Sequence, residues 1–344
     1  MKRVFILLLV VLGISACENQ PISFGDYDYN AVYFPVQLPL RTLSLGEDRI
    51  DNALDKQYIF DIAASIGGMY ENPKNWTVDY ELDTSLTTKV YTTTNLKIIP
   101  LLPAYYTISP LNTITIPKGS FNGRVRVQLT SAFFDDTLAI TGQYVIPLKI
   151  TGSSADTVLS GKAAVINPDR RVKTDWESNK SPKDWVMYGI NYVNAYHGTY
   201  FHHGKDIQVT TATGVPFDTV VFRNRYVERD PLITLTTIGR MKVITNGVGP
   251  LAGSNKMTLT FDNDKGNSGT VTISPRTGSP ISVTGSGQYY DIASSKEQWT
   301  LLTWQSMYLN YTYQDATLTH NITDTLIFRD RGIKWQELSI KIVP

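Results

Sequence analysis

The sequence predicts an all-β protein built from two domains. Apolar and polar residues alternate through most of the chain, and Gly, Pro, Asn or Asp interrupts the alternation at short intervals. The alternation is clearest in segments 113–116, 124–129, 256–261 and 270–273, each of which would turn one face towards a core. Long amphipathic helix patterns are missing. A chain of 344 residues is long enough to form two separate cores.

The first seventeen residues have the pattern of an export signal. Lys2 and Arg3 precede an apolar run over residues 4–12, which is shorter than the roughly 20 residues that a membrane span needs. The run ends in Ile14-Ser15-Ala16-Cys17, which resembles the lipobox of bacterial lipoproteins. This resemblance implies that residues 1–16 are removed and that Cys17 is acylated. The alternative is that Cys17 is an ordinary residue of a signal peptide.

Acylation at Cys17 would anchor the protein firmly to a membrane, because each buried methylene of an acyl chain contributes about 0.8 kcal/mol. Cys17 is also the only cysteine of the chain. The mature protein is therefore predicted to contain no disulfide, no thiol nucleophile and no cysteine metal site.

The charge balance argues against nucleic acid as a partner. The chain has 32 Lys and Arg residues and 31 Asp and Glu residues, so its formal net charge is +1, and the two signs are mixed along the sequence. Nucleic-acid binding requires a basic face, which this pattern does not predict. A nearly neutral composition with 20 tyrosines is better suited to uncharged partners.

Composition changes along the chain give the predicted domain boundaries. Residues 17–30 are polar and aromatic without a period, which is typical of a tether, and a strand pattern starts at Ala31. A charged stretch follows Asn167-Pro168 and continues to Asp184. The predicted order is a signal peptide (1–16), a tether (17–30), a β-sandwich (31–167), a linker (168–185) and a second β domain (186–344), either a larger sandwich or a small closed barrel.

Two groups of motifs resemble a known lipoprotein family. Segments 114–120 and 144–150 resemble the immunoglobulin-like N-terminal domain of Bacteroidetes lipoproteins, which also precedes the catalytic barrel of some family-18 endoglycosidases. Segments 196–200, 299–313 and 324–332 are similar to the lipocalin-like domain that often follows it. The resemblance implies an immunoglobulin-like β-sandwich followed by a lipocalin-like β-barrel of unknown function.

The same resemblance implies a location and a biological setting. It predicts a lipoprotein of the outer membrane that acts in polysaccharide utilisation, with other outer-membrane uptake proteins as partners. Surface export in these bacteria usually follows acidic residues after the lipidated cysteine, and here only Glu18 follows Cys17 closely. The sequence therefore leaves open which face of the membrane carries the protein.

The residues give no support for catalysis. Glycan cleavage requires two carboxylates about 5 to 9.5 Å apart, but the glutamates are scattered and the acidic signature of family 18 is missing. The chain also contains no Gly-x-Ser-x-Gly elbow and no phosphate-binding loop. We therefore predict a protein that is not an enzyme and has no cofactor.

The histidines do not form a predicted metal site. Of the four, His197, His202 and His203 lie close together in the sequence, and His320 is remote. On a strand, His202 and His203 point to opposite faces, so they cannot both bind one ion without a bulge. The favoured interpretation is that these imidazoles lie on the surface where a loop enters a strand.

Aromatic residues suggest a place for a ligand. Saccharide rings stack on Trp and Tyr, while polar side chains bind the hydroxyl groups. Tyrosines recur every four residues in 188–200, which puts them on one face of an extended segment, and further aromatics cluster in 299–313. The predicted ligand-binding residues are Tyr196, His197, Tyr200, Trp299 and Trp304. The alternative is that these rings belong to the core.

The predicted function is non-catalytic binding of a glycan or glycopeptide. Two other functions stay open from the sequence. One is a structural or adhesion role in the cell envelope, which would need no aromatic groove. The other is a lipocalin-like carrier of an apolar small molecule, which would require an apolar cavity inside the second domain.

Overall fold

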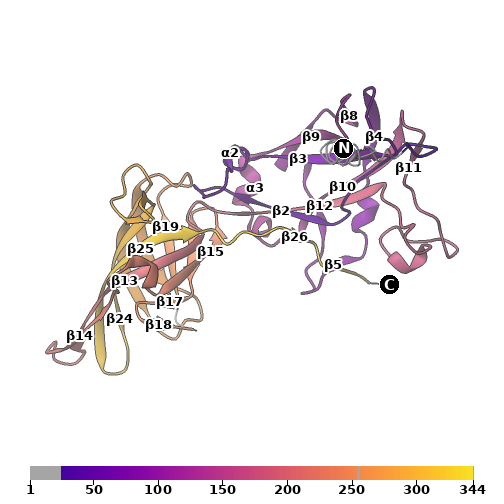
Figure 1. Ribbon diagram of the computed structural model, residues 1–344. Helices are drawn as coiled ribbons and strands as arrows, with labels where there is room; N and C mark the ends of the chain where they lie inside the picture. Colours follow the sequence, from indigo (N-terminus) through magenta and orange to yellow (C-terminus); the bar gives the residue numbers. More distant parts are fainter. Residues whose placement is uncertain (1–24, 254–255, 344) are drawn as a thin grey trace, which may run out of the picture.

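The computed structural model describes residues 25–253 and 256–343 as two β units side by side. In Figure 1 the unit that carries the N-terminal half of the chain lies on the right, and the barrel lies on the left. The predicted signal peptide and Cys17 fall outside the described residues, as does most of the tether. Across the described ranges, no helix has the length and apolar character that a membrane crossing requires.

Two facing sheets form the first unit, in a sandwich-like arrangement. One sheet has the order β11 (Thr157–Val158), β1 (Ala31–Tyr33), β3 (Ile59–Gly67), β9 (Asn122–Leu129) and β7 (Tyr106–Ser109). The other has the order β26 (Gln336–Glu337), β2 (Pro39–Ser44), β12 (Trp185–Val193), β10 (Tyr144–Ser153), β4 (Trp76–Leu82) and β8 (Thr113–Ile116), with β6 (Ile99–Pro100) paired to β10. Short elements complete the unit: α2 (Ala53–Lys56), α3 (Ser131–Asp135), η1 (Thr84–Thr87), η2 (Pro103–Tyr105), η3 (Thr137–Ile140) and η4 (Lys173–Asp175).

The alternation predicted from the sequence places the core between these sheets. In β9, Val125 and Val127 are fully buried while Arg124 and Arg126 point to solvent. The same alternation in β8 buries Ile114 and Ile116. Each strand thereby removes one apolar face from water, which is the main stabilising contribution to a sandwich.

A closed barrel of eight strands forms the second unit, as the all-β prediction allowed. Its strands are β13 (Gly198–Thr210), β15 (Leu232–Gly239), β16 (Lys242–Thr245), β19 (Met257–Phe261), β20 (Gly269–Pro275), β21 (Val283–Tyr290), β24 (Ser306–Gln314) and β25 (Leu318–Asp330). Antiparallel pairing of β13 with β25 closes the barrel. The turn between β19 and β20 contains Gly266, which has a φ of +70°.

Shorter elements surround the barrel strands. The edge strand β14 (Pro216–Phe222) pairs only with β13, and the two extend away from the first unit. The remaining elements are β17 (Gly247–Val248), β18 (Leu251–Ala252), β22 (Gln298–Trp299), β23 (Leu302–Thr303) and η5 (Val227–Arg229).

The predicted domain boundary is wrong in its position. Strand β12 pairs with both β10 and β2, so residues 185–193 belong to the sheet of the first unit. The chain also returns after the barrel, because β26 pairs with β2 and β27 (Ile340–Ile342) pairs with β5 (Val90–Thr92). The barrel is therefore formed by the part of the chain between β12 and β26, which both belong to the sheet of the first unit. Charge alone could not reveal this, because long-range pairing decides which sheet a strand joins.

The predicted linker 168–185 is folded onto the first unit. Trp176 and Asp184 in this segment are buried, and the indole Nε1 of Trp176 donates to the carbonyl of Asp169 at 2.9 Å. Arg171 binds the Asp169 carboxylate through Nε and Nη2, at 2.8 and 2.6 Å. The charges that suggested a mobile linker instead pair with one another and hold the segment in place.

Candidate functional site

The predicted aromatic site lies in the core of the barrel. Tyr196 and Tyr200 are fully buried, and Trp304 is 8% exposed. The Tyr196 ring stacks on Phe261, and its hydroxyl donates to the Asn263 carbonyl at 2.8 Å. These three rings cannot form the exposed stacking surface that the prediction required, so that part of the prediction is wrong. The alternative interpretation as core residues describes them better.

His197 and Trp299 are only partly buried, but both make hydrogen bonds to the backbone within the barrel unit. The backbone N–H of Thr237 donates to Nδ1 of His197 at 3.1 Å. Burial and the nearby charge of Arg331 lower the pKa of His197 to about 4. The indole Nε1 of Trp299 donates to the carbonyl of Phe328 at 2.8 Å. We therefore place the candidate site elsewhere.

The other three histidines are buried, and for His202 and His203 this contradicts the predicted surface position. His202 Nε2 lies 2.7 Å from a carboxylate oxygen of Asp324, and His320 Nδ1 lies 2.7 Å from one of Asp206. His203 is paired with Asp230 at 2.8 Å. Within the described residues, no three His, Cys, Asp or Glu side chains are grouped in a way that could hold a metal ion. Each imidazole is satisfied by a carboxylate instead.

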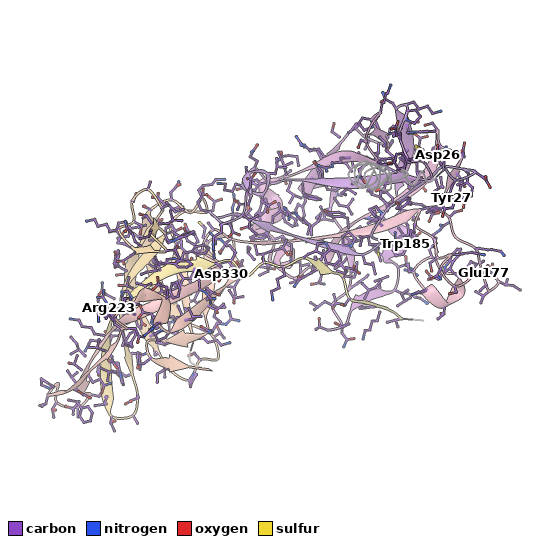
Figure 2. All side chains as sticks on the ribbon, in the orientation of Figure 1. Asp26, Tyr27, Glu177, Trp185, Arg223 and Asp330 are labelled. Carbon is purple, nitrogen blue, oxygen red and sulfur yellow. The ribbon has the colours of Figure 1, made fainter. Side chains whose placement is uncertain are left out.

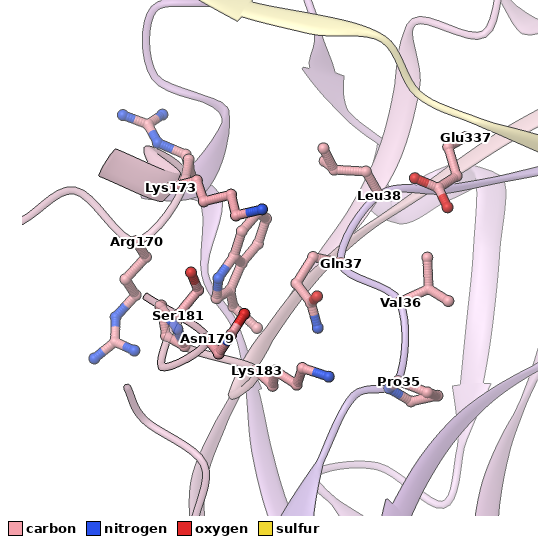
Figure 3. Close-up of a pocket in the computed structure, with 13 residues that line it drawn as sticks. Pro35, Val36, Gln37, Leu38, Arg170, Lys173, Asn179, Ser181, Lys183 and Glu337 are labelled. Atoms are coloured by element: carbon pink, nitrogen blue, oxygen red, sulfur yellow. The ribbon is translucent and has the colours of Figure 1, made fainter. Parts of the chain in front are cut away.

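A cavity of about 720 Å³ lies in the wall of the first unit (Figure 3). On one side are residues of the 170–183 segment, including Lys173 and Lys183, and on the other are residues 35–38 with Glu337. Trp185, the first residue of β12, also lines it. Three stretches that are distant in the sequence therefore meet around one space, and this space has a size that suits a small ligand.

The wall formed by residues 170–183 is held by fixed contacts. Besides binding Asp169, Arg171 donates from Nη1 to the carbonyls of Leu86 and Thr88, at 2.9 and 2.7 Å. Arg171 holds the pKa of Asp169 below its usual value through their side-chain hydrogen bond. Arg170 is paired with the buried carboxylate of Asp184. The two arginines thus serve mainly to shape the cavity.

The lysines of the same wall are differently placed. Within the described part of the chain, no carboxylate lies within ion-pairing distance of Lys173 or Lys183, and both side chains are exposed. The Nζ of Lys183 lies 5.6 Å from the centre of the Tyr33 ring. Trp185 also lines the cavity, but its Nε1 is buried and has no acceptor among the described residues. The hydrogen-bond donors that the wall offers to a ligand are therefore the two exposed ammonium groups.

Two further hollows adjoin this cavity and share Lys183 with it. One, of about 300 Å³, is lined by Tyr27, Tyr29 and Tyr33, and another, of about 650 Å³, by Tyr29, Asn179 and Ser181. Tyr27 is 79% exposed and Tyr29 is 53% exposed. Figure 2 places Tyr27 and Trp185 on the first unit, away from the barrel. We call the three hollows together the lysine–tyrosine groove.

Sequence reasoning missed this groove for identifiable reasons. Tyr27 and Tyr29 fall in the segment predicted to be a tether, and Lys173 and Lys183 fall in the predicted linker. A usable signal was present, because two tryptophans within a charged stretch are unusual for a mobile linker. The contribution of Glu337 had no local signal, because it depends on the return of the chain to β2.

Fold and groove together define a class of protein, a two-unit β protein with a sandwich-like first unit and a closed eight-stranded barrel. A family model described as an N-terminal domain matches residues 27–157, and the model of a domain of unknown function, DUF5627, matches residues 195–332. A solved structure of a Bacteroides ovatus protein of unknown function is 31% identical, has a TM-score of 0.81, and matches over 92% of this chain and 100% of its own. The chain therefore belongs to the same family as this Bacteroides ovatus protein.

More distant solved structures share less of the geometry. A multidomain Bacteroides ovatus protein that includes DUF1735 is 13% identical, with a TM-score of 0.39 over 89% of this chain and 97% of its own. An auxiliary nutrient binding protein from Bacteroides thetaiotaomicron is 15% identical, with a TM-score of 0.36 over 83% of this chain and 89% of its own. These likenesses carry no conclusion about function. No curated protein matches the sequence.

Proposed function

We propose that this chain is a non-catalytic lipoprotein of the outer membrane that binds a glycan or glycopeptide in the lysine–tyrosine groove. The observation that carries the proposal is the presence of exposed tyrosine rings beside amide, hydroxyl and ammonium groups in adjoining hollows. Saccharides stack their C–H faces on such rings and use such polar groups for their hydroxyls. A groove of several joined hollows also fits a chain of sugar units better than a single small molecule.

The composition of the groove supports binding without cleavage. Glu337 is the one carboxylate among the described residues that line the largest hollow. Hydrolysis of a glycosidic bond uses two carboxyl groups on opposite sides of the bond. A site with a single carboxylate and several cations is better suited to holding a sugar chain than to breaking it.

The N-terminal signal and the place of the groove support the proposed setting. Cys17 is the proposed point of acylation. Asp26 and Tyr27, which lie on the first unit (Figure 2), follow Cys17 closely in the sequence. A glycan bound near Tyr27 would lie close to the anchored end of the chain. That position is suited to passing a ligand to an uptake protein in the same membrane.

The test is a glycan-array screen of the mature chain without its acyl anchor, followed by calorimetry with any glycan retained. Replacing Tyr27 and Tyr29 by Ala should weaken binding about 30-fold, because each lost stacking face contributes about 1 kcal/mol. Tyr70→Ala is the matched control, because Tyr70 is 72% exposed but does not line the groove. Equal affinity of the double variant and the control would contradict the proposed site.

A further inference from the structure

The largest hollow of the groove contains unbalanced positive charge. Four cationic residues line it, and two of these, Arg170 and Arg171, are neutralised by their carboxylate partners. Lys173 and Lys183 have no such partner within the described residues, and Glu337 on the opposite side offsets only one of them. The hollow therefore keeps a positive charge that the fold itself does not use.

The backbone fixes the positions from which these two lysines extend. Lys183 donates its backbone N–H to the carbonyl of Leu159 at 2.7 Å, and its own carbonyl accepts from the N–H of Phe34 at 2.8 Å. Lys173 starts the short helical turn η4, which is followed at once by the buried Trp176. A ligand that binds both ammonium groups would need to order only their side chains.

The hydrogen-bonding groups also favour an acceptor-rich ligand. The exposed ammonium groups of Lys173 and Lys183 can only donate hydrogen bonds. The neighbouring Asp184 has one carboxylate oxygen without a donor, but its charge is already paired with Arg170. Carboxylate and sulfate oxygens are the acceptors that best match an excess of charged donors.

We infer that the saccharide bound in the groove is acidic, and that its carboxylate or sulfate group lies between Lys173 and Lys183. This inference rests on the proposed function, which it narrows to one substrate class. Neutral parts of the same saccharide lie against Tyr27 and Tyr29 in the adjoining hollow. Lys183 lines both this hollow and the charged one, so one saccharide can extend from one to the other. The positive charge thus selects the ligand, and the rings contribute affinity for any sugar.

The test compares an oligouronate with its methyl ester, because the two share one sugar backbone and only the free acid carries negative charge. Calorimetry at low ionic strength should show the free acid binding about tenfold more tightly than the ester. Replacing both Lys173 and Lys183 by Gln should remove this preference, so that the acid and the ester bind the variant with the same affinity. Glu337→Gln should strengthen binding of the acid, because it removes the opposing charge. A sulfated oligosaccharide and its desulfated form provide a second pair.

Lys118→Gln is the matched control, because Lys118 is an exposed lysine that does not line the groove. Thermal unfolding checks that each variant is folded, and single replacements serve if the double variant is unstable. Equal binding of acid and ester would overturn the acidic ligand and leave the proposed function standing. If neither saccharide binds while vesicles of phosphatidylethanolamine and phosphatidylglycerol capture the wild type through both lysines, the ligand is an anionic lipid surface. That result would overturn both proposals.

Discussion

Arg331, which follows the last barrel strand, donates from Nη2 to the backbone carbonyl of Glu47 in the first unit at 2.8 Å. Arg331 is 3% exposed, and its Nη1 also donates to the carbonyls of Asn194 and His197. Gly46 allows this approach, because a Cβ there would lie 2.0 Å from the same Nη2. One buried cation therefore joins the end of the barrel to the loop after β2.

Arg331→Met should lower the free energy of unfolding by about 2 to 4 kcal/mol, because several buried carbonyls lose a charged donor. Arg331→Lys should rescue little, since one ammonium cannot reproduce the planar arrangement of the guanidinium. Urea denaturation gives the values. Arg329→Met is the control, because the Arg329 side chain is 42% exposed, and its cost should stay within about 0.5 kcal/mol. Similar losses in both variants would show that Arg331 has no special role.

The stability of the protein should depend on the protonation of His197. Its folded pKa of about 4 lies below the unfolded value near 6.5, so the unfolded chain binds more protons between these pH values. The free energy of unfolding should therefore fall by about 2 kcal/mol as the pH is lowered from 7 to 4.5. Protonation at Nδ1 would also remove the acceptor of the Thr237 N–H.

His197→Gln should flatten this part of the pH profile, because glutamine does not titrate. Urea denaturation at several pH values between 7 and 4.5 measures the effect. His203→Gln in β13 serves as a comparison, since the partner of His203 is a carboxylate rather than a backbone N–H. A profile of unchanged slope in the His197 variant would show that another group causes the pH dependence.

The return of the chain after the barrel should stabilise the first unit. Leu338 is 7% exposed and packs in a small core with Val145, Trp185 and Met187. Gly189 makes room for it, because a Cβ at this position would lie 2.7 Å from Leu338 Cδ1. Leu338→Ala should cost about 2 to 4 kcal/mol in unfolding free energy, through lost burial and the space left behind.

Trp335→Ala is the control for this change, because Trp335 is 70% exposed and its removal should cost less than about 0.5 kcal/mol. Chemical denaturation followed by fluorescence gives both values. If Leu338→Ala leaves the unfolding midpoint where it is, residues 336–342 contribute no stability to the first unit.

Cys17→Ala should release the protein from membranes and leave its fold unchanged. The thiol is the proposed site of acylation, and no other cysteine is present to replace it. Cell fractionation with an antibody, together with labelling by radioactive palmitate, follows the change. Ser15→Gly, which keeps a small residue in the lipobox, should leave the protein in the membrane fraction. Palmitate labelling of the Cys17 variant would refute the lipid anchor.

Much of the fold was predictable because strands have a local signature. The alternation in 124–129 and 270–273 marks β9 and β20, and Gly266 marks the turn before β20. The position of the domain boundary was not predictable in this way. Alternation shows that residues 185–193 form a strand, but not that this strand pairs with β2 and β10.

The candidate site was harder to predict than the fold, because identical residue types serve cores and binding surfaces. Tyr196 and Tyr27 are both tyrosines, yet Tyr196 is fully buried and Tyr27 is 79% exposed. The histidines show the same limit: the sequence placed His202 on the surface, but it lies in the barrel against Asp324, 122 residues away.

The sequence by itself determined the β-rich character of the protein and its capacity for two units, and it predicts a lipobox ending in Cys17, because each depends on neighbouring residues or on overall composition. Only the tertiary structure decided that Lys173 and Lys183 face Glu337 and residues 35–38 across one cavity. The physical reason is that this cavity is formed by pairings between distant strands. The pairing of β26 with β2 brings residues 336–337 next to residues 39–40. No local sequence pattern predicts a contact between residues so far apart in the chain.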